Sequence, residues 1–238
     1  MQIVYEDNHI IIVNKESGEI VQGDKTGDRP LSETVKDYIK EKYQKPGAVF
    51  LGVVHRLDRP VSGLVVFART SKALTRLNKM FAEKDEIKKT YWAIVEKGQG
   101  ARSKGQEDSD EWMTLEHWLV RNEKQNKSYA YDHEVPNSKK AILKYRVLAE
   151  GDNYNLVEVQ LLTGRHHQIR CQLATIGRPI KGDLKYGAKR SNPDGSISLQ
   201  SHRIEFTHPV SKEHIAIEAP IPNDPLWQAL YQCIVHNA

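Results

Sequence analysis

Asp58 has the sequence neighbours that most clearly suggest chemistry in this chain of 238 residues. It lies in the segment His-Arg-Leu-Asp-Arg at 55–59, between two arginines and shortly before an apolar run at 63–68 that we predict to be a buried strand. Nearby guanidinium groups favour the ionised form of a carboxylate, which can then act as a nucleophile or a base without a metal. A salt bridge within the loop would give the same pattern and is the more common case.

Two adjacent histidines offer a second arrangement. His166 and His167, with or without Asp183, could serve as ligands of a zinc ion. Neighbouring residues of a helix point about 100 degrees apart, however, and metal-binding helices space their histidines by three or four residues. We therefore rank zinc binding low and interpret both histidines as contacts to phosphate or bases, or as surface residues.

Tyr91 offers a third arrangement. It lies in a predicted strand at 88–95, where Tyr91, Ala93 and Val95 share one face. A tyrosine that points inward is usually part of the core, and the spacing favours that interpretation. If its ring faces a pocket instead, it could stack on an extruded nucleobase.

Strands and helices that would position these residues can be read from the hydrophobic pattern. Strands are predicted at 2–5, 10–14, 49–54, 63–68, 88–95, 112–120, 139–148, 154–162, 202–206 and 214–218. Helices are predicted at 31–43, after a cap at Ser71, within 164–177 and at 226–235. A surface loop is predicted at 98–109, and a polar stretch at 121–137 separates two of the strands. The order predicts an α+β fold with a mixed, largely antiparallel sheet and flanking helices, as a single domain over 1–238.

Composition and charge narrow the class of protein. No leader peptide and no apolar run of membrane-spanning length is present, so we expect a cytoplasmic protein with its two cysteines reduced. The net charge is only +4, yet residues 160–190 contain seven lysines and arginines against one acid. This segregation is typical of a phosphate-binding face, although a solvated lysine-rich surface is about as compatible with it.

Together, these segments resemble a known family. The stretches His-Arg-Leu-Asp-Arg-Pro-Val-Ser-Gly-Leu at 55–64, Lys-Thr-Tyr-Trp-Ala at 89–93 and Thr-Gly-Arg-His-His-Gln-Ile-Arg at 163–170 resemble, in order and spacing, the three motifs of the RluA family of pseudouridine synthases. Further similarity lies at 13–15, 178–183 and 208–209. The chain departs from the family pattern at Val61, Glu16 and Ser17, and it resembles the catalytic domain alone, without an S4-type domain.

The resemblance implies an isomerase. The N1–C1′ bond of a uridine in RNA breaks, the base rotates, and C5 joins C1′, so neither a cofactor nor a metal is expected. It also implies a pseudouridine synthase fold with a central RNA-binding cleft, and structured rRNA or tRNA as the partner of what we expect to be a monomer. The sequence does not select the target uridine.

Residue roles follow from the same resemblance. Asp58 matches the essential aspartate, with attack on the sugar and removal of a sugar proton both open. Arg170 matches the arginine that pairs with it, and Tyr91 matches the tyrosine that stacks on the flipped base and could receive the C5 proton. These three must converge in one cationic cleft. The residues expected to contact RNA are Arg56, Arg165, His167, Lys181 and Lys185.

Two rival functions stay open. An RNA-binding or RNA-remodelling protein of this fold without catalysis would keep the cations but need not keep Asp58, Tyr91 or Arg170, and all three are present. A metal-dependent hydrolase is the third choice.

Overall fold

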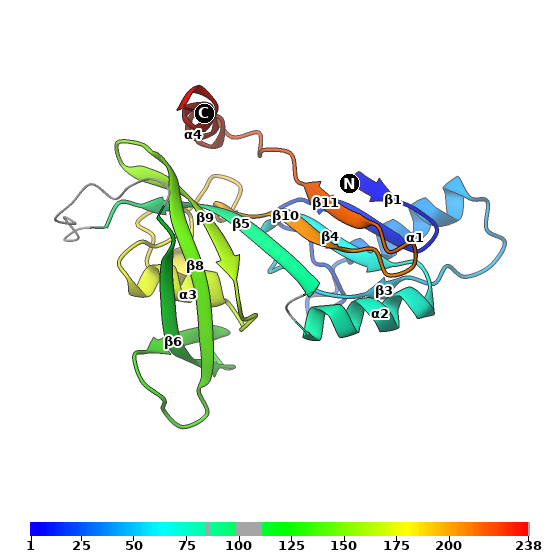
Figure 1. The fold of residues 1–238 in the computed structure, drawn as a ribbon, viewed down its shortest axis with the longest axis horizontal. Helices are drawn as coiled ribbons and strands as arrows, with labels where there is room; N and C mark the ends of the chain where they lie inside the picture. Colours follow the sequence, from blue (N-terminus) through cyan, green and yellow to red (C-terminus); the bar gives the residue numbers. More distant parts are fainter. Residues whose placement is uncertain (84–85, 99–110, 238) are drawn as a thin grey trace. The chain divides into compact units, whose positions relative to one another are not determined.

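The computed structural model describes residues 1–83, 86–98 and 111–237 (Figure 1). The chain forms two compact units. Unit 1 contains Met1–Lys89 and Gln200–Pro220, and unit 2 contains Thr90–Leu199 and Ile221–Ala238. Strand pairing is mostly antiparallel, the β4–β10 pair is parallel, and helices flank the strands. The predicted α+β class with a mixed, largely antiparallel sheet is therefore confirmed.

Unit 1 is built on a set of paired strands, and two of them, β2 (Ile10–Lys15) and β4 (Ser62–Ala68), are covered on both faces. Its strands are β1 (Gln2–Glu6), β2 (Ile10–Lys15), β4 (Ser62–Ala68), β10 (Leu199–Thr207) and β11 (His214–Glu218), paired in that order, with the short β3 (Gly52–Val53) paired to β4. Its helices are α1 (Leu31–Lys42) and α2 (Ser71–Ala82).

Alternation along β2 explains why that strand is apolar on both faces. Ile10 and Ile12 lie in one buried cluster with Leu77 of α2, whereas Ile11 lies in a second cluster with Val35 of α1. Because successive side chains of a strand point to opposite faces, two covering helices require a nearly continuous apolar run. The buried strand predicted at 63–68 is confirmed as part of β4.

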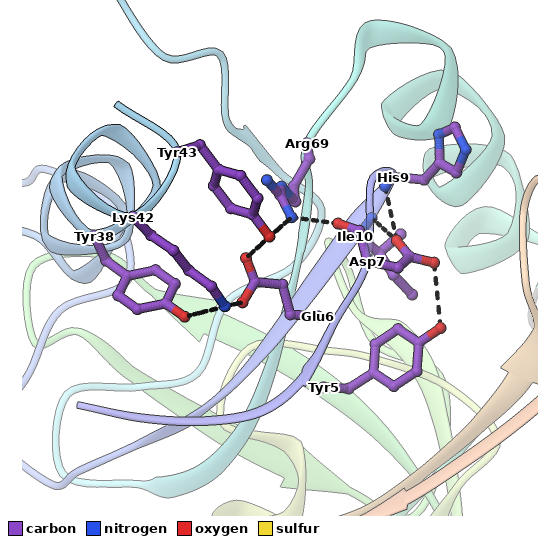
Figure 2. A network of polar contacts seen from close by, with 9 residues as sticks. All are labelled: Tyr5, Glu6, Asp7, His9, Ile10, Tyr38, Lys42, Tyr43 and Arg69. Carbon is purple, nitrogen blue, oxygen red and sulfur yellow. Dashed lines mark hydrogen bonds and ion pairs between the residues drawn. The ribbon is translucent and has the colours of Figure 1, made fainter. Parts of the chain in front are cut away.

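A network of polar contacts fixes the end of β1 in unit 1 (Figure 2). The carboxylate of Glu6 accepts hydrogen bonds from Tyr38 at 3.0 Å, Tyr43 at 2.9 Å and Lys42 at 2.7 Å, and pairs with Arg69 at 3.0 Å. Burial alone would raise the pKa of Glu6, but the hydrogen bonds from Lys42 and the tyrosines outweigh burial and lower it. The network ties α1 to β1.

Unit 2 has a helix against each face of its strands. The strands are β5 (Ile87–Glu96), β9 (Tyr154–Leu161), β8 (Lys139–Glu150), β6 (Met113–Asn122) and β7 (Lys127–Tyr131), paired in that order. The helices are α3 (Gln168–Thr175), the short 3-10 helix η2 (Leu184–Tyr186) and α4 (Pro225–Asn237). Figure 1 shows β6, β8 and β9 side by side with α3 near them.

The two faces of the unit 2 sheet have different cores. Trp92 of β5 and Leu156 of β9 pack with Trp227 of α4. On the opposite face, Leu119 of β6 packs with Cys171 of α3. Both cysteines, Cys171 and Cys233, are free thiols.

Several predicted elements differ from the structure. The strand expected at 49–54 is reduced to Gly52–Val53. The polar stretch 121–137, in which no strand was predicted, contains strand β7. The cap of α2 is Thr70 and not Ser71, because the Thr70 hydroxyl accepts the Ala73 N–H at 3.1 Å.

Two further expectations concern the loop at 98–109 and helices long enough to span a membrane. The surface loop predicted at 98–109 lies, apart from Gly98, outside the described residues. Among the helices that the structure describes, none is long and apolar enough to cross a membrane.

Candidate active site

Asp58 lies in the loop of unit 1 that joins β3 to β4. Its side chain is partly buried, Arg56 is exposed, and the Asp58 carbonyl accepts the Val61 N–H at 3.0 Å to close a turn. The guanidinium of Arg59 pairs with the carboxylate of Asp28 and donates to the Thr26 hydroxyl at 2.9 Å. Arg59 therefore links this loop to the preceding one.

A buried lysine supports the Asp58 loop. Lys15, at the end of β2, is 0% exposed, and its Nζ donates to the carbonyls of Glu16 at 2.8 Å, Arg59 at 3.1 Å and Val61 at 2.7 Å. Burial lowers the pKa of Lys15 to about 8, although the charges of Glu19 and Asp58 oppose the shift. The carbonyls of Arg59 and Val61, which follow Asp58 in the loop, are thus bonded to one buried ammonium group, and the Arg59 carbonyl also accepts the Gly18 N–H at 2.8 Å.

His55 holds the other end of the same loop. Its Nε2 accepts the backbone N–H of Val66 in β4 at 3.0 Å, and its ring stacks on Phe81 with centroids 4.8 Å apart. Burial, followed by the charge of Lys89, lowers the pKa of His55 to about 3, so the ring is neutral and its hydrogen is on Nδ1. The Asp58 loop is therefore attached to the sheet on both sides.

Tyr91 occupies a defined face of unit 2. Its side chain is 8% exposed, it pairs with Val159, and Val159 pairs with Tyr145. Tyr145 lies on the same face of β8 as Ala141, which belongs to the cluster around Cys171 of α3. Tyr91, Ala93 and Val95 thus share the face that α3 covers, as their spacing predicts, while Trp92 points to α4.

Arg170 of α3 is a buried cation with an assigned carboxylate. Its side chain is 6% exposed, its Nε lies 2.6 Å from Oδ2 of Asp183, and its Nη2 lies 2.9 Å from Oδ1. Nη1 donates to Nε2 of His167 at 3.1 Å. Asp183, which sequence reasoning considered only as a zinc ligand, is therefore an ion-pair partner of Arg170.

His166 and His167 are not arranged as residues of one helix. His167 has a φ of 52° and precedes α3, which begins at Gln168, so the two rings stack with centroids 3.8 Å apart. Nδ1 of His167 lies 3.0 Å from the Tyr186 hydroxyl, and burial, together with the Arg170 charge, lowers the pKa of His167 to about 2. Both nitrogens of a neutral ring are engaged within the protein.

The geometry gives no support to the zinc hypothesis. The expected divergence of about 100 degrees between the two histidines was wrong, because the left-handed backbone at His167 brings the rings into a stack. In the described part of the chain, no three histidine, cysteine or acidic side chains are grouped as metal ligands.

The remaining predicted RNA contacts lie on the loops around α3. Arg165 is partly exposed and donates from Nε to the Lys140 carbonyl at 3.0 Å. Lys181 donates to the Asn192 side chain at 2.6 Å. Lys185 is exposed and donates to the Asn126 carbonyl at 3.1 Å. His167 is only 9% exposed, so contact with RNA would use the remaining edge of its ring.

The predicted residues therefore divide between the two units. Tyr91 and Arg170 belong to unit 2, on or against one face of its strands, and Asp58 belongs to unit 1. Their convergence in one cleft stays a prediction. Sequence reasoning missed Tyr186 and the role of Lys15, although both lie in or beside segments that carry the resemblance.

Comparison with known proteins identifies the family. Residues 9–175 match the family described as RNA pseudouridylate synthase. The chain is 33% identical to the uncharacterized RNA pseudouridine synthase YhcT of Bacillus subtilis, covering 94% of the chain and 70% of the relative. It is 32% identical to ribosomal large subunit pseudouridine synthase C of Vibrio cholerae, over 92% of the chain and 65% of the relative.

The chain is also similar to a tRNA-modifying enzyme in sequence and to a solved structure in fold. The chain is 29% identical to tRNA pseudouridine synthase C of Vibrio parahaemolyticus, over 97% of the chain and 94% of the relative. A solved structure, human RNA pseudouridylate synthase domain containing 4, superposes with a TM-score of 0.75 at 19% identity, over 98% of this chain and 93% of that one, which shows the fold. The chain belongs to the RNA pseudouridylate synthase family, of the RluA type, and is an isomerase that acts on RNA.

Proposed function

We propose that this protein isomerises specific uridines of structured rRNA or tRNA, with Asp58 as the essential aspartate. The observation that carries the proposal is the support of the Asp58 loop by the fully buried Lys15. A partly buried loop whose carbonyls are satisfied by an ammonium group is preorganised, and catalytic groups need to be held near their productive geometry.

The proposed reaction assigns one task to each residue. The target uridine leaves its stack at a cost of about a few kcal/mol, which is lower in a loop than in a helix. Tyr91 stacks on the extruded base and is a candidate to receive the C5 proton. Asp58 acts at the ribose, as a nucleophile or as the base for a sugar proton, while the N1–C1′ bond breaks and the C5–C1′ bond forms. Arg170 orients Asp58.

The RNA would be held by cations of both units acting as a single catalytic domain. Arg56 is a candidate to enter the gap left by the extruded base. Arg165, Lys181 and Lys185, together with the edge of His167, are candidates to contact the backbone near the flipped nucleotide. Phosphate contacts of this kind offset the cost of extrusion.

Release of tritium from 5-tritiated uridine in transcribed rRNA and tRNA tests the proposal. We expect multiple turnover by the wild type, with loss of turnover in Asp58→Asn and unchanged turnover in Asp152→Asn, an exposed aspartate of unit 2. Turnover by Asp58→Asn would overturn the assignment of Asp58. Binding of RNA by the wild type without any tritium release would favour the non-catalytic rival. Mapping pseudouridines in total RNA with and without this gene would identify the target.

A further inference from the structure

Strands β6 and β7 of unit 2 depart from the usual alternation of apolar and polar residues. On the face that α3 covers, Leu119 of β6 and Ala141 of β8 are buried. An antiparallel strand with one packed face normally turns polar side chains outward. Four outward positions of β6 and β7 are instead aromatic or apolar: Trp118, Val120, Tyr129 and Tyr131. We call these four residues the aromatic face.

Cross-strand pairing puts the aromatic face together. Trp118 pairs with Tyr131, and Val120 pairs with Tyr129. Directly paired side chains have their Cβ atoms about 5 Å apart, and residues two apart on one strand are separated by about 7 Å. Tyr129 and Tyr131 are 39% and 40% exposed, and Trp118 is partly exposed. Two neighbouring rows of the sheet thus present their rings to solvent.

The aromatic face lies on the side of the sheet opposite to Tyr91. Tyr91 pairs with Val159, Val159 pairs with Tyr145, and Tyr145 pairs with Met113 of β6. Met113 and Trp118 are five positions apart on one strand, so their side chains point to opposite faces. The proposed stacking of the target base on Tyr91 therefore does not use the aromatic face.

Helix α4 lies on the same side of the sheet as the aromatic face but packs on other strands. It contacts Trp92 of β5 and Leu156 of β9. The pairing order is β5-β9-β8-β6-β7, so the aromatic face is at the other edge of the unit 2 strands. Exposed aromatic residues gathered in one place on a sheet mark an interaction surface.

Lysines are interspersed with the aromatic rings. Nζ of Lys127, two positions before Tyr129, lies 5.5 Å from the centroid of that ring. Lys140 pairs with Trp118, and Lys144 lies on the same face of β8. Both of these lysines are exposed. Cations therefore surround the rings on two sides.

The charge of this surface is positive on balance. Glu116 of β6 also points to this side, but it is ion-paired with Lys140 at 2.6 Å. Arg165 brings another guanidinium close, because its Nε donates to the Lys140 carbonyl at 3.0 Å. Such a surface is complementary to a polyanion that carries flat rings.

We propose that the aromatic face is a second RNA-binding surface, on which unpaired bases of the substrate RNA stack while Lys127 and Lys144 contact phosphates. The ligand is a single-stranded segment outside the target uridine. The inference goes beyond the proposed function. It rests on the action of the family on RNA, and not on the role of Asp58.

Ring chemistry and charge together favour RNA over a protein partner. Every base has a π face, so aromatic side chains with cations between them bind single strands with little regard to sequence. RRM domains use aromatic residues on a sheet in the same way. The core of a protein–protein interface is depleted in lysine, whereas lysines lie between the rings of this surface.

A cationic route connects the aromatic face to the α3 side of unit 2. Strand β7 ends the pairing order, and Nζ of Lys127 also lies 5.2 Å from the ring centroid of Tyr186. Lys185, a predicted RNA contact, donates to the carbonyl of Asn126, which precedes Lys127. An RNA strand held near Lys185 would reach the aromatic face past this edge at a high effective concentration.

Binding of a single strand tests the proposal. Fluorescence anisotropy measures Kd for a labelled oligouridylate of about ten nucleotides. Tyr131→Leu keeps an apolar side chain but loses the ring, and should raise Kd about tenfold. Tyr131→Phe should bind as the wild type does. Tyr43→Leu replaces an exposed tyrosine of unit 1 and should also keep the wild-type Kd. A wild-type Kd in Tyr131→Leu would overturn the proposal.

Two measurements separate stacking from a general effect of charge. Lys144→Gln should lower the slope of log Kd against log salt by about 1, whereas Tyr131→Leu should leave that slope unchanged. A strand that contains 4-thiouridine should crosslink under ultraviolet light to residues 118–131. Crosslinks confined to other parts of the chain would exclude the aromatic face as the binding surface.

Kinetics separate this surface from the proposed function. With tritiated rRNA or tRNA transcripts, Tyr131→Leu should raise KM about tenfold at unchanged kcat, because the ring acts in binding and not in the chemical step. An unchanged KM would refute the proposal. Binding that depends on Tyr131 without tritium release by the wild type would remove the proposed function and leave this surface in place.

Oligomeric state tests the main alternative. If the aromatic face bound a second copy of the chain, the wild type would sediment as a dimer and Tyr131→Leu as a monomer, with equal affinity for the oligouridylate. That result would overturn the proposal. Thermal melting accompanies each assay, and Tyr129→Leu replaces Tyr131→Leu if the latter does not fold, with the same expected rise in Kd.

Discussion

The buried ammonium of Lys15 takes the place of the solvent that the Asp58 loop would otherwise need. An isolated buried lysine is costly, and proteins rarely bury one completely unless it is paired or fully hydrogen-bonded. Here the three bonds go to backbone carbonyls, two of them in the loop itself. The buried charge of Lys15 therefore stabilises the conformation of a backbone segment that lies outside the strands.

Lys15→Met should destabilise the protein strongly. The carbonyls of Glu16, Arg59 and Val61 lose the Lys15 donor, although the Arg59 carbonyl keeps the Gly18 N–H at 2.8 Å. Each unsatisfied buried acceptor costs about 1 kcal/mol or more, so the free energy of unfolding should fall by at least about 2 kcal/mol. Urea denaturation measures the change. The exposed Lys72→Met on α2 serves as the control and should stay within about 0.5 kcal/mol of the wild type. Equal effects of the two substitutions would contradict the supporting role of Lys15.

Three histidines buried in neutral form make the protein sensitive to acid. The pKa is lowered to about 3 for His55, about 2 for His167 and about 4 for His202, in each case mainly by burial. The unfolded chain protonates these groups near pH 6.5, and the folded protein does so only at much lower pH. Stability is therefore full above about pH 6.5 and falls as the pH falls towards the folded-state values.

His202→Gln should reduce this dependence on pH. Each such histidine lowers the free energy of unfolding by about 1 to 2 kcal/mol when the pH falls from 7 to 5. The free energy of unfolding of His202→Gln should therefore fall by about 1 to 2 kcal/mol less than that of the wild type. Urea denaturation at the two pH values gives the difference. The exposed His133→Gln should show the wild-type dependence. An unchanged slope in His202→Gln would refute its neutral burial.

At the scale of elements, the parallel contact between β4 and β10 depends on one glycine. Gly63 has a φ of 108°, and a Cβ there would lie 2.3 Å from the Ser201 carbonyl oxygen. Ser201 is the residue with which Gly63 pairs. Backbone conformation and the approach of β10 thus require glycine at the point where the Asp58 loop enters β4.

Gly63→Ala should separate the two strands. Gly27 also has a positive φ, of 77°, but nothing lies within 4 Å of its added Cβ, so Gly27→Ala carries the conformational cost alone. We expect Gly63→Ala to lower the unfolding free energy by at least about 2 kcal/mol more than Gly27→Ala, because a backbone clash is added. Thermal melting of both variants makes the comparison, and equal melting temperatures would argue against the clash.

The elements also show what a sequence can and cannot predict. The apolar run of β4 and the amphipathic pattern of α1 were predictable, since each has the period of its element and a buried face. β7 was not, because Lys-Ser-Tyr-Ala-Tyr at an edge has only one covered face and little apolar content. The Asp183–Arg170 pair is made through a turn whose shape depends on Gly182, which composition does not reveal.

At the scale of the whole molecule, the one acid of 160–190 is paired within that segment, so the excess of cations there is carried by the other six lysines and arginines. Arg170 is neutralised by Asp183, and Lys181 is hydrogen-bonded to Asn192. Exposed cations such as Lys185 therefore account for most of the charge available to phosphates. Binding of RNA should still weaken as salt increases, because each phosphate contact releases counterions.

Lys185→Gln should reduce the salt dependence of RNA binding. Loss of one phosphate contact lowers the slope of log Kd against log salt by about 1. Fluorescence anisotropy with a labelled RNA hairpin over a salt series measures it. Lys72→Gln should keep the wild-type slope, and an unchanged slope in Lys185→Gln would remove Lys185 from the RNA-binding set.

The division of the chain into units has a consequence for its synthesis. Unit 1 takes residues from Met1–Lys89 and again from Gln200–Pro220, and α4, which packs on Trp92, follows both segments in the chain. A chain emerging from the ribosome cannot pair β4 with β10 until 199–207 has been translated, nor cover Trp92 until 225–237 has been translated. Completion of both units therefore waits for these later segments, and until then the edge of β4 is exposed to wrong partners.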